Sequence, residues 1–396
     1  MLNFFVHPLV RKNRLLLSLC LLWLLRIMFL RQGNVGGVAI NRYVLLQIVI
    51  ELWLLLLLAV RGMDFMQIFR VRPLRWFSWL YLLGVFSGFW SLLPLMSSYF
   101  AFQNLLALAV LLYFFRQVED LFQAEKFLFC AASVILAMFF ISCWNMPEPD
   151  FHSVSISTVS GALFLYSAAE YDPAECSVAR RRLLRIGIVG GLLMLWLTSS
   201  AGALVGVACG VVAMTFLAKS RVMRLTAGMS VAGILVAYWL CGGDFLLRLL
   251  FPGKSWLSVQ TGHGRMRVWT EILERASERP WFGWGYACLE RRLEVVYTID
   301  THNAALGVLG NLGYVGCALG LVALLSSLVF MFRRRGFVGM RGVLIAMIGA
   351  LVNSNSSNFI VGKASVASVA FQSLLVLGCV CGMLGAPERQ KNTSES

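Results

Sequence analysis

NAALGVLGNLGYVGCALGLVALLSSLVFMF, residues 303–332, is a run of 30 residues without an Asp, Glu, Lys or Arg. An α-helix needs about 20 predominantly apolar residues to cross the hydrocarbon core of a bilayer, so this run predicts a membrane-spanning helix. Its several glycines do not change that expectation. The fold class to expect is therefore an all-α integral membrane protein.

The composition of the whole chain agrees with this expectation. Of its 396 residues, 59% are hydrophobic and 13% are charged, and the mean hydropathy is +0.78. Ordinary soluble domains carry about 25% charged residues, so the composition excludes a soluble globular protein and a disordered one. The net charge of +15 in a membrane protein first reflects topology, and no soluble basic surface indicates a nucleic-acid partner.

Similar apolar windows occur on both sides of residues 303–332. Together they predict a polytopic protein with about twelve membrane-spanning helices, surrounded by membrane lipids. The run at 15–30 follows basic residues but precedes no small-residue cleavage site, so we expect an uncleaved first span rather than a signal peptide. The other windows are 38–60, 76–97, 99–115, 127–144, 154–170, 186–200, 201–218, 225–243, 337–352 and 364–385.

The basic residues between these windows predict the orientation. With a cytoplasmic N-terminus, the inner loops hold the basic clusters 180–185, 219–224 and 333–335, whereas the outer loops hold little beyond Arg31 and Lys363. This asymmetry follows the positive-inside rule and puts both termini in the cytoplasm. The polar break at residues 198–202 then falls at the outer face, between two short helices.

Residues 244–302 form one long polar segment that the count of spans places outside the membrane. A loop of this length in a compact membrane domain is usually functional. The expected organisation is nine spans in residues 1–243, the outer loop in 244–302, three spans in 303–386 and a disordered cytoplasmic tail in 387–396.

Within this loop, the pattern predicts a helix over about residues 265–279 that Pro280 ends. Val268, Ile272 and Leu273 share its apolar face. Gly264 and Arg265 stand at its start, where free backbone N–H groups and a guanidinium suit an anion such as a phosphate. The alternative is a glycine turn followed by a solvated arginine.

An aromatic and glycine cluster, residues 281–286, follows the helix. Its rings suit an interfacial anchor at headgroup depth, and a platform on which sugars stack is the alternative. The loop ends at His302 and Asn303. A histidine is neutral at pH 7 when its pKa is near 6.5, so His302 suits a general base that Asn303 orients; a polar cap is the alternative.

Other candidates are fewer. Lys363 is the only cation of the last outer loop, so it either helps to hold an anion or anchors the interface. No HExxH pattern, aspartate pair or zinc-type cysteine spacing is present, so no metal is expected.

Taken together, these residues resemble the core of the O-antigen ligase and polymerase superfamily. The resemblance covers roughly residues 190–320, and the order and spacing of its motifs carry it. The motifs are Gly264-Arg265-x-x-Val268-Trp269, Pro280-x-Phe282-Gly283-x-Gly285, His302-Asn303-x-x-Leu306 and Gly313-x-x-Gly316.

The resemblance implies an inverting, metal-independent glycosyltransferase of the GT-C type, acting at the periplasmic face of the bacterial inner membrane without a cofactor. Its donor would be a glycan on undecaprenyl pyrophosphate, and its acceptor a hydroxyl of lipid A-core or of another glycan. By analogy, Arg265 would bind the pyrophosphate and His302 would activate the acceptor. Gly264, Arg267, Trp269 and Asn303 would complete the substrate-binding site.

One motif departs from the family pattern. Family members commonly carry an arginine after the serine in the outer-face motif that here reads Leu-Thr-Ser-Ser-Ala-Gly, residues 197–202. Ser200 or Ala201 stands in that place, so the second pyrophosphate cation is missing there. Arg267 or Lys363 substitutes for it, or the donor differs, or activity is reduced.

Two other functions compete with a ligase. A polymerase of the same superfamily would use the same fold and chemistry, but the earlier outer loop 145–153 is short and carries no Lys or Arg, which favours a ligase. A flippase or transporter would place paired charges at the midplane and often shows internal repeats. This chain instead concentrates its polar residues outside the membrane. Oligomeric state does not follow from the sequence.

Overall fold

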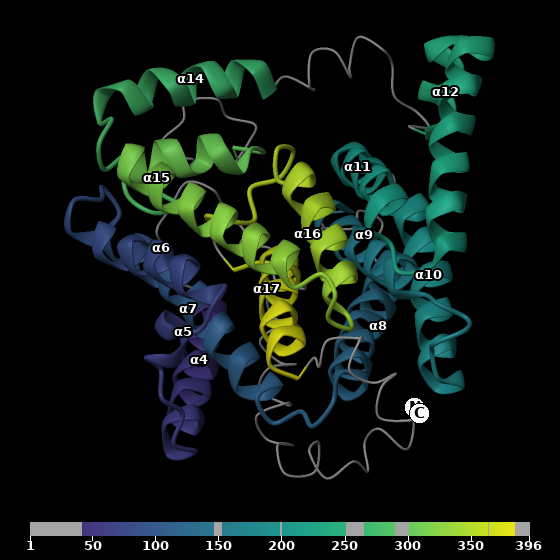
Figure 1. Ribbon diagram of the computed structural model, residues 1–396. Coiled ribbons are helices and arrows are strands. Elements are labelled where there is room, and N and C mark those ends of the chain that lie inside the picture. Colours follow the sequence, from purple (N-terminus) through teal and green to yellow (C-terminus); the bar gives the residue numbers. More distant parts are fainter. Residues whose placement is uncertain are drawn as a thin grey trace.

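The computed structural model describes residues 42–145, 153–198, 200–250, 265–289, 301–362 and 364–384, and its regular elements there are helices (Figure 1). The first predicted span, residues 15–30, and the C-terminal tail lie outside these ranges. The helices are α4 Arg42–Val60, α5 Gln67–Arg70, α6 Leu74–Phe86, η1 Ser87–Phe89, α7 Pro94–Phe115, α8 Leu121–Asn145, α9 Ser153–Glu170, α10 Val178–Thr198, α11 Ala201–Leu217, α12 Arg221–Leu250, α14 Arg265–Glu278, α15 Ala304–Arg333, α16 Met340–Asn353 and α17 Val366–Leu384.

Each apolar window that falls within the described residues coincides with one helix, with one exception. The window 76–97 is divided, because α6 ends at Phe86 and Pro94 already begins α7. Among the described residues, four helices are long and apolar enough to cross a membrane: α7, the Arg221–Gly243 part of α12, α15 and α17. Leu45–Val60, α11 and α16 are apolar but shorter. These findings support an α-helical membrane protein, whereas the number of about twelve spans stays a prediction.

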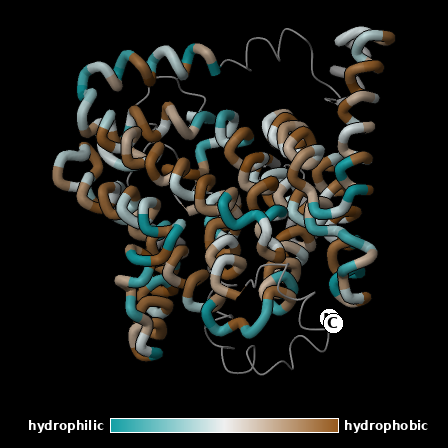
Figure 2. Tube along the Cα trace, viewed as in Figure 1, coloured by the Kyte–Doolittle hydropathy of each residue, from teal (hydrophilic) through white to brown (hydrophobic). Residues whose placement is uncertain are grey.

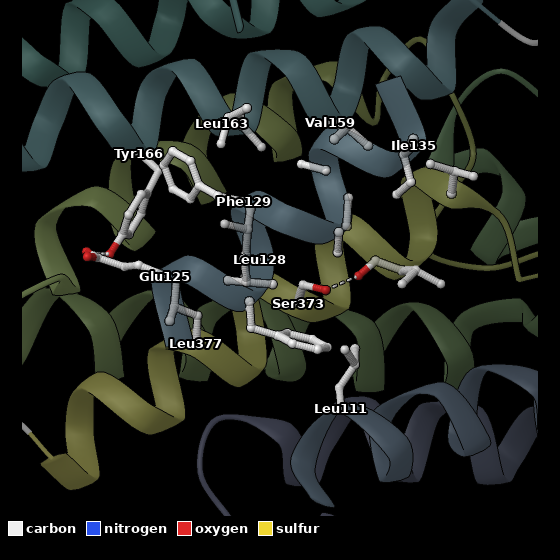
Figure 3. Close-up of a pocket in the computed structure, with 18 of the residues that line it drawn as sticks. Leu111, Glu125, Leu128, Phe129, Ile135, Val159, Leu163, Tyr166, Ser373 and Leu377 are labelled. Carbon is white, nitrogen blue, oxygen red and sulfur yellow. Dashed lines mark hydrogen bonds between the residues drawn. The ribbon is translucent and has the colours of Figure 1, made fainter. Parts of the chain in front are cut away.

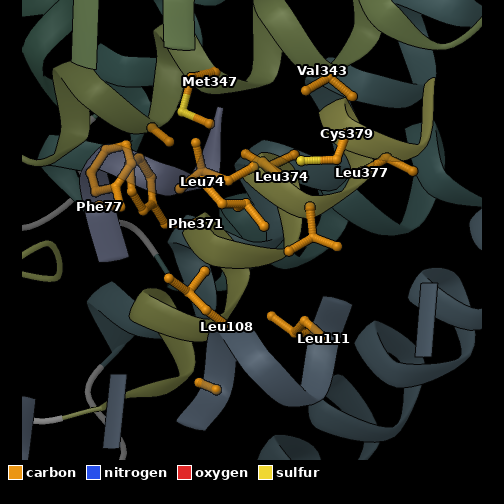
Figure 4. Close-up of a cluster of buried hydrophobic side chains, with 14 of the residues drawn as sticks. Leu74, Phe77, Leu108, Leu111, Val343, Met347, Phe371, Leu374, Leu377 and Cys379 are labelled. Atoms are coloured by element: carbon orange, nitrogen blue, oxygen red, sulfur yellow. The ribbon is translucent and has the colours of Figure 1, made fainter. Parts of the chain in front are cut away.

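The core of the bundle lies around α17, which packs against α7, α9 and α16. Figure 4 shows this core, where Phe77 and Phe371 meet edge to face at 5.4 Å between ring centroids. In contrast, α12 contacts chiefly α11, and its Trp239 is 82% exposed. Hydrophobic positions recur along this helix in Figure 2. An exposed apolar helix of this kind suits a lipid environment.

The predicted break near residue 200 is confirmed. α10 ends at Thr198, Ser200 is the N-cap residue of α11, and α11 begins at Ala201. The two helices then pack on different partners, α10 on α9 and α11 on α16. Gly206 of α11 lies directly against the backbone of Gly349 in α16, which is the close approach that small residues permit between membrane helices.

A buried ion cluster joins four helices at the end of the bundle opposite α14. Arg180 of α10 donates to both carboxylate oxygens of Glu125 in α8, with Nη2–Oε1 at 2.6 Å and Nε–Oε2 at 2.8 Å. Arg180 also pairs with Glu170 at the end of α9, and Glu170 accepts from the backbone N–H groups of Gly339 and Gly342 at the start of α16. Arg180, counted in the sequence with the basic residues of an inner loop, is thus a buried residue of α10.

Helix α15 is broken at Gly313, whose φ of 63° and ψ of −160° are not helical. The part after the break, residues 314–333, spans roughly 30 Å at 1.5 Å per residue, which suffices to cross a bilayer. The part before it, residues 304–312, packs beneath α14 (Figure 1). We call residues 265–289 and 301–312 the roof.

The roof has a small hydrophobic core of its own. Val268, Ile272 and Leu289 are buried there, and Trp269, Trp284 and Leu306 pack against them. The predicted helix over 265–279 is confirmed as α14, Arg265–Glu278. The prediction for Leu273 is wrong, since its side chain is 50% exposed and Ala276 is buried in its place. Val268, Ile272 and Ala276 are spaced four residues apart, whereas Leu273 points away from that line.

Candidate functional site

The break in α15 is held by backbone contact with the segment that follows α14. Tyr314 N donates to Pro280 O at 2.7 Å and Val315 N to Trp281 O at 3.1 Å, while the N–H groups of residues 284 and 285 donate to the carbonyls of residues 310 and 311. Gly283 and Gly313 both have positive φ, and a Cβ on either would collide with the opposite backbone. We call this pairing of residues 280–285 with residues 310–315 the clasp.

The aromatic cluster 281–286 therefore contributes to the packing and hydrogen bonding of the roof. The indole N–H of Trp284 donates to Arg275 O at 2.8 Å, and the Arg279 guanidinium lies 4.3 Å from the centroid of the Trp284 ring. Trp281 and Phe282 are 66% and 52% exposed, so their rings remain available for the predicted interfacial contact.

Tyr286, fully buried, ties the roof to the middle of the bundle. Its hydroxyl accepts from Asn104 Nδ2 at 3.1 Å and from Gly362 N at 3.2 Å, and Asn104 also donates to Gly362 O at 2.9 Å. Because Asn104 is midway along α7, the non-helical segment before α17 reaches deep into the bundle. Such backbone is tolerated at membrane depth where protein surrounds it. Lys363, which follows Gly362, lies outside the described residues.

His302 directly precedes Asn303, the N-cap residue of α15, and has a φ of 49°, in the left-handed region that non-glycine residues seldom adopt. Its neighbours in the chain are fixed on both sides. The Thr301 hydroxyl donates to Asn303 O at 3.0 Å, and the Asn303 side chain caps α15 by accepting from Leu306 N at 3.1 Å. The orienting role predicted for Asn303 stays a prediction, since the bond that fixes its side chain is this helix cap. Unusual backbone of this kind clusters at functional sites.

Trp269 connects α14 to this turn. Its indole Nε1 donates to the carbonyl oxygen of Thr301 at 3.0 Å. Arg265 is four residues earlier, so it lies one turn away on the same side of α14. The structure thus joins the first part of α14 to the turn before α15 through this hydrogen bond. Arg265 is half-buried and Arg267 is exposed, while Gly264 lies outside the described residues.

The start of α11 reaches the same region through the segment after α16. Asn353 and Ser356 pack over Gly202, two residues after Ser200, and Ser354 O accepts from Ala304 N at 2.8 Å. Ser200 itself is buried, and within the described residues its side chain makes no capping hydrogen bond to α11. Three helix starts, those of α11, α14 and α15, therefore belong to one region of the molecule.

Sequence reasoning did not find Thr301 and Ser354, which fix the turn around His302. Thr301 is fully buried and Ser354 lies in a polar run between two apolar windows. The run Asn353–Asn358 could have indicated a packed polar segment, but its partners lie far away in the sequence. No hint in the sequence marks Thr301 as buried.

This arrangement suits recognition of an anion beside a base. Helix starts present free N–H groups and a positive dipole end, and Arg265 adds a permanent charge. Among the described residues, no group of three or more His, Cys, Asp or Glu side chains could hold a metal ion.

A separate cavity of about 160 Å³ lies between α7, α8, α9 and α17 (Figure 3). Its walls are almost wholly apolar, with side chains such as Leu163 and Leu377. Glu125 and Tyr166, hydrogen-bonded at 2.7 Å, stand at one end of it. None of the predicted site residues lines this cavity.

Comparison with known proteins supports the family that the motifs resemble. Residues 186–321 match the sequence model of the family described as O-antigen ligase. This segment includes the helix break near Ser200, the roof and the clasp. An O-antigen ligase of Pseudomonas aeruginosa is 26% identical over 185 residues, which are 45% of this chain and 41% of that relative. The match thus spans less than half of the relative's length. Both findings support the O-antigen ligase superfamily.

Proposed function

We propose, with the match to the O-antigen ligase family as the premise, that this chain is a glycosyltransferase of the bacterial inner membrane. It moves a glycan from undecaprenyl pyrophosphate to a hydroxyl of lipid A-core or of another glycan. The observation that carries the proposal is the turn at His302, which Trp269 joins to the helix that begins with Arg265. The roof then faces the periplasm, about twelve helices span the membrane, and both termini are cytoplasmic.

In the proposed reaction, His302 accepts the proton of the acceptor hydroxyl. The oxygen attacks the anomeric carbon from the side opposite the pyrophosphate, so that the configuration inverts. The bond from the anomeric carbon to the pyrophosphate oxygen breaks, and the pyrophosphate leaves with the electron pair. Arg265 at the start of α14 stabilises the negative charge of that leaving group. The step needs no metal and no cofactor.

The other predicted residues surround the same pyrophosphate. Ser200 and the first backbone N–H groups of α11, a helix of 17 residues, stand where the family carries its second arginine. The buried position of Ser200 supports a role in holding an anion without that arginine. Arg267 and Lys363 supply the further positive charge, and Gly264 and Asn303 contribute to binding of the substrate.

The test is the length of the lipid-linked glycan that accumulates in cells whose only copy of the protein is His302→Ala, with wild type at the same expression level as the control. Long chains on undecaprenyl pyrophosphate beside a bare acceptor identify a ligase. Single repeat units identify a polymerase. A glycan profile identical to wild type, from a variant shown to be folded and inserted, would rule out His302 as the base.

A further inference from the structure

We infer that Trp269 is a positioning residue: its indole N–H fixes the carbonyl of Thr301 and thereby the direction in which His302 points. The inference rests on the proposed role of His302 as the base. It gives Trp269 a task different from the substrate contact predicted from the sequence.

The contacts around His302 carry this inference. The Trp269 Nε1–Thr301 O distance is 3.0 Å, and Thr301 has no exposed surface. On the other side, Asn303 is fixed as the N-cap of α15, and Ala304 N donates to Ser354 O at 2.8 Å. His302, with a φ of 49°, is thus a single left-handed residue between two immobilised neighbours. Removing one of these attachments lets the turn relax toward ordinary backbone angles, and the imidazole moves with it.

The position of Trp269 on α14 adds a second argument. Arg265 begins α14, and Trp269 of the same helix bonds to the carbonyl of the residue before His302. Arg265 and Trp269 are one helical turn apart. A rigid helix therefore sets the spacing between the proposed pyrophosphate cation and the proposed base. Catalytic groups that must act on one bond need this kind of fixed spacing, since a misplacement of about 1 Å can cost a hundredfold in rate.

The chain offers a matched control. Trp284 makes the same kind of bond in the same roof, from its indole N–H to Arg275 O at 2.8 Å, but this bond is made at the C-terminal end of α14 and not to the turn that holds His302. Trp269→Phe and Trp284→Phe each keep an aromatic ring and remove one N–H donor. Their general effect on the stability of the roof is therefore alike, and only the first touches the turn at His302.

The experiment measures transfer in membranes that contain the full chain, with undecaprenyl-pyrophosphate-linked glycan and lipid A-core extracted from cells that lack the protein. For Trp269→Phe, kcat should fall roughly tenfold to a hundredfold while KM for the donor changes by less than about twofold. Trp284→Phe should keep the wild-type kcat. A rise in KM at constant kcat would show that Trp269 binds substrate instead, and would overturn the positioning role.

A second measurement needs no turnover. Diethyl pyrocarbonate modifies histidine side chains, and mass spectrometry of peptides gives the rate at His302, with His152 and His263 as internal references. Trp269→Phe should change the rate at His302 several-fold and leave the references unchanged. Equal rates of modification at His302 in Trp269→Phe, Trp284→Phe and wild type would overturn the inference. Trp269→Met, which also lacks the donor, replaces Trp269→Phe if that variant inserts poorly.

The two proposals fail in different ways. If His302→Ala transfers glycan as fast as wild type, the proposed base is wrong. If His302→Ala is inactive but Trp269→Phe has wild-type kcat and wild-type modification of His302, only the positioning role is wrong.

Discussion

At the scale of single residues, His302 combines a strained backbone with a chemical task. A left-handed non-glycine residue costs on the order of 1–3 kcal/mol, which the surrounding bonds of Thr301 and Asn303 must offset. Glycine adopts such angles freely, so substitution by glycine removes the side chain without adding backbone strain.

His302→Gly should therefore lose activity by roughly a hundredfold or more, the scale of general-base catalysis, without a fall in thermal stability. Added imidazole should recover part of the lost rate, because it can accept the proton from the space that the side chain leaves. The measurement is the transfer rate against imidazole concentration. An inactive variant that imidazole does not rescue, although it is as stable as wild type, would count against a base at this position.

Arg265 is expected to act on the leaving group. Arg265→Ala should lower transfer by about a hundredfold or more, the scale seen when one charge-stabilising donor is lost. The control is Arg275→Ala at the other end of the same helix, where Arg275 pairs with Glu278 on the surface at 3.5 Å. The measurement is the initial rate of glycan transfer at saturating donor. Equal rates in Arg265→Ala and Arg275→Ala would contradict the pyrophosphate role of Arg265.

At the scale of elements, the clasp explains why two glycines far apart in the sequence are needed together. Gly283 faces the backbone of Asn311 and Gly313 faces that of Trp281, and both have positive φ. A side chain at either position meets backbone rather than a movable side chain, so the strand-like pairing must open to admit it.

Gly313→Ala should therefore destabilise the protein by about 1–3 kcal/mol or more, through backbone strain and loss of clasp hydrogen bonds. Gly320→Ala in the same helix is the control, since its Cβ would meet side chains only at 3.9 Å. Thermal unfolding in detergent, followed by size-exclusion chromatography, gives the two midpoints. Equal midpoints would mean that the clasp contributes little to stability.

Sequence patterns predicted the elements whose signals are local. The helix from Arg265 follows from its apolar spacing and Pro280, and the break near Ser200 follows from a polar interruption. The break in α15 could not be predicted, because residues 303–332 contain no charged residue or proline and the sequence does not tell which of the glycines has a positive φ. That angle depends on contacts with residues 280–285.

At the scale of the whole molecule, the two ends of the bundle use polar residues differently. The α14 end gathers helix starts, hydroxyls and amides around His302. The opposite end buries Arg180 between Glu125 and Glu170, so that the charges neutralise one another. Motifs in the sequence drew attention to the residues of the α14 end. Arg180, in contrast, was counted with the basic residues of an inner loop, because its partners Glu125 and Glu170 cannot be recognised from the sequence.

Arg180→Ala should be severely destabilising, by about 3–5 kcal/mol, because it leaves two carboxylates buried without their cation. Arg182→Ala removes an exposed arginine of the same helix and should change stability little. The yield of folded protein and its unfolding temperature in detergent test the difference. An Arg180→Ala protein as stable as the Arg182→Ala protein would mean that the ion cluster contributes no stability.

The ion cluster also has a consequence for the growing chain. Glu170 and Gly339, whose N–H it accepts, are 169 residues apart in the sequence. A ribosome that adds roughly 5 to 20 residues per second needs on the order of 8 to 34 s to make that stretch. During this interval Arg180, only ten residues after Glu170, has already been synthesised, whereas the start of α16 has not. The pairing of α8, α9 and α10 can therefore form first, and the amides of α16 complete it only after residues 339–342 have been synthesised.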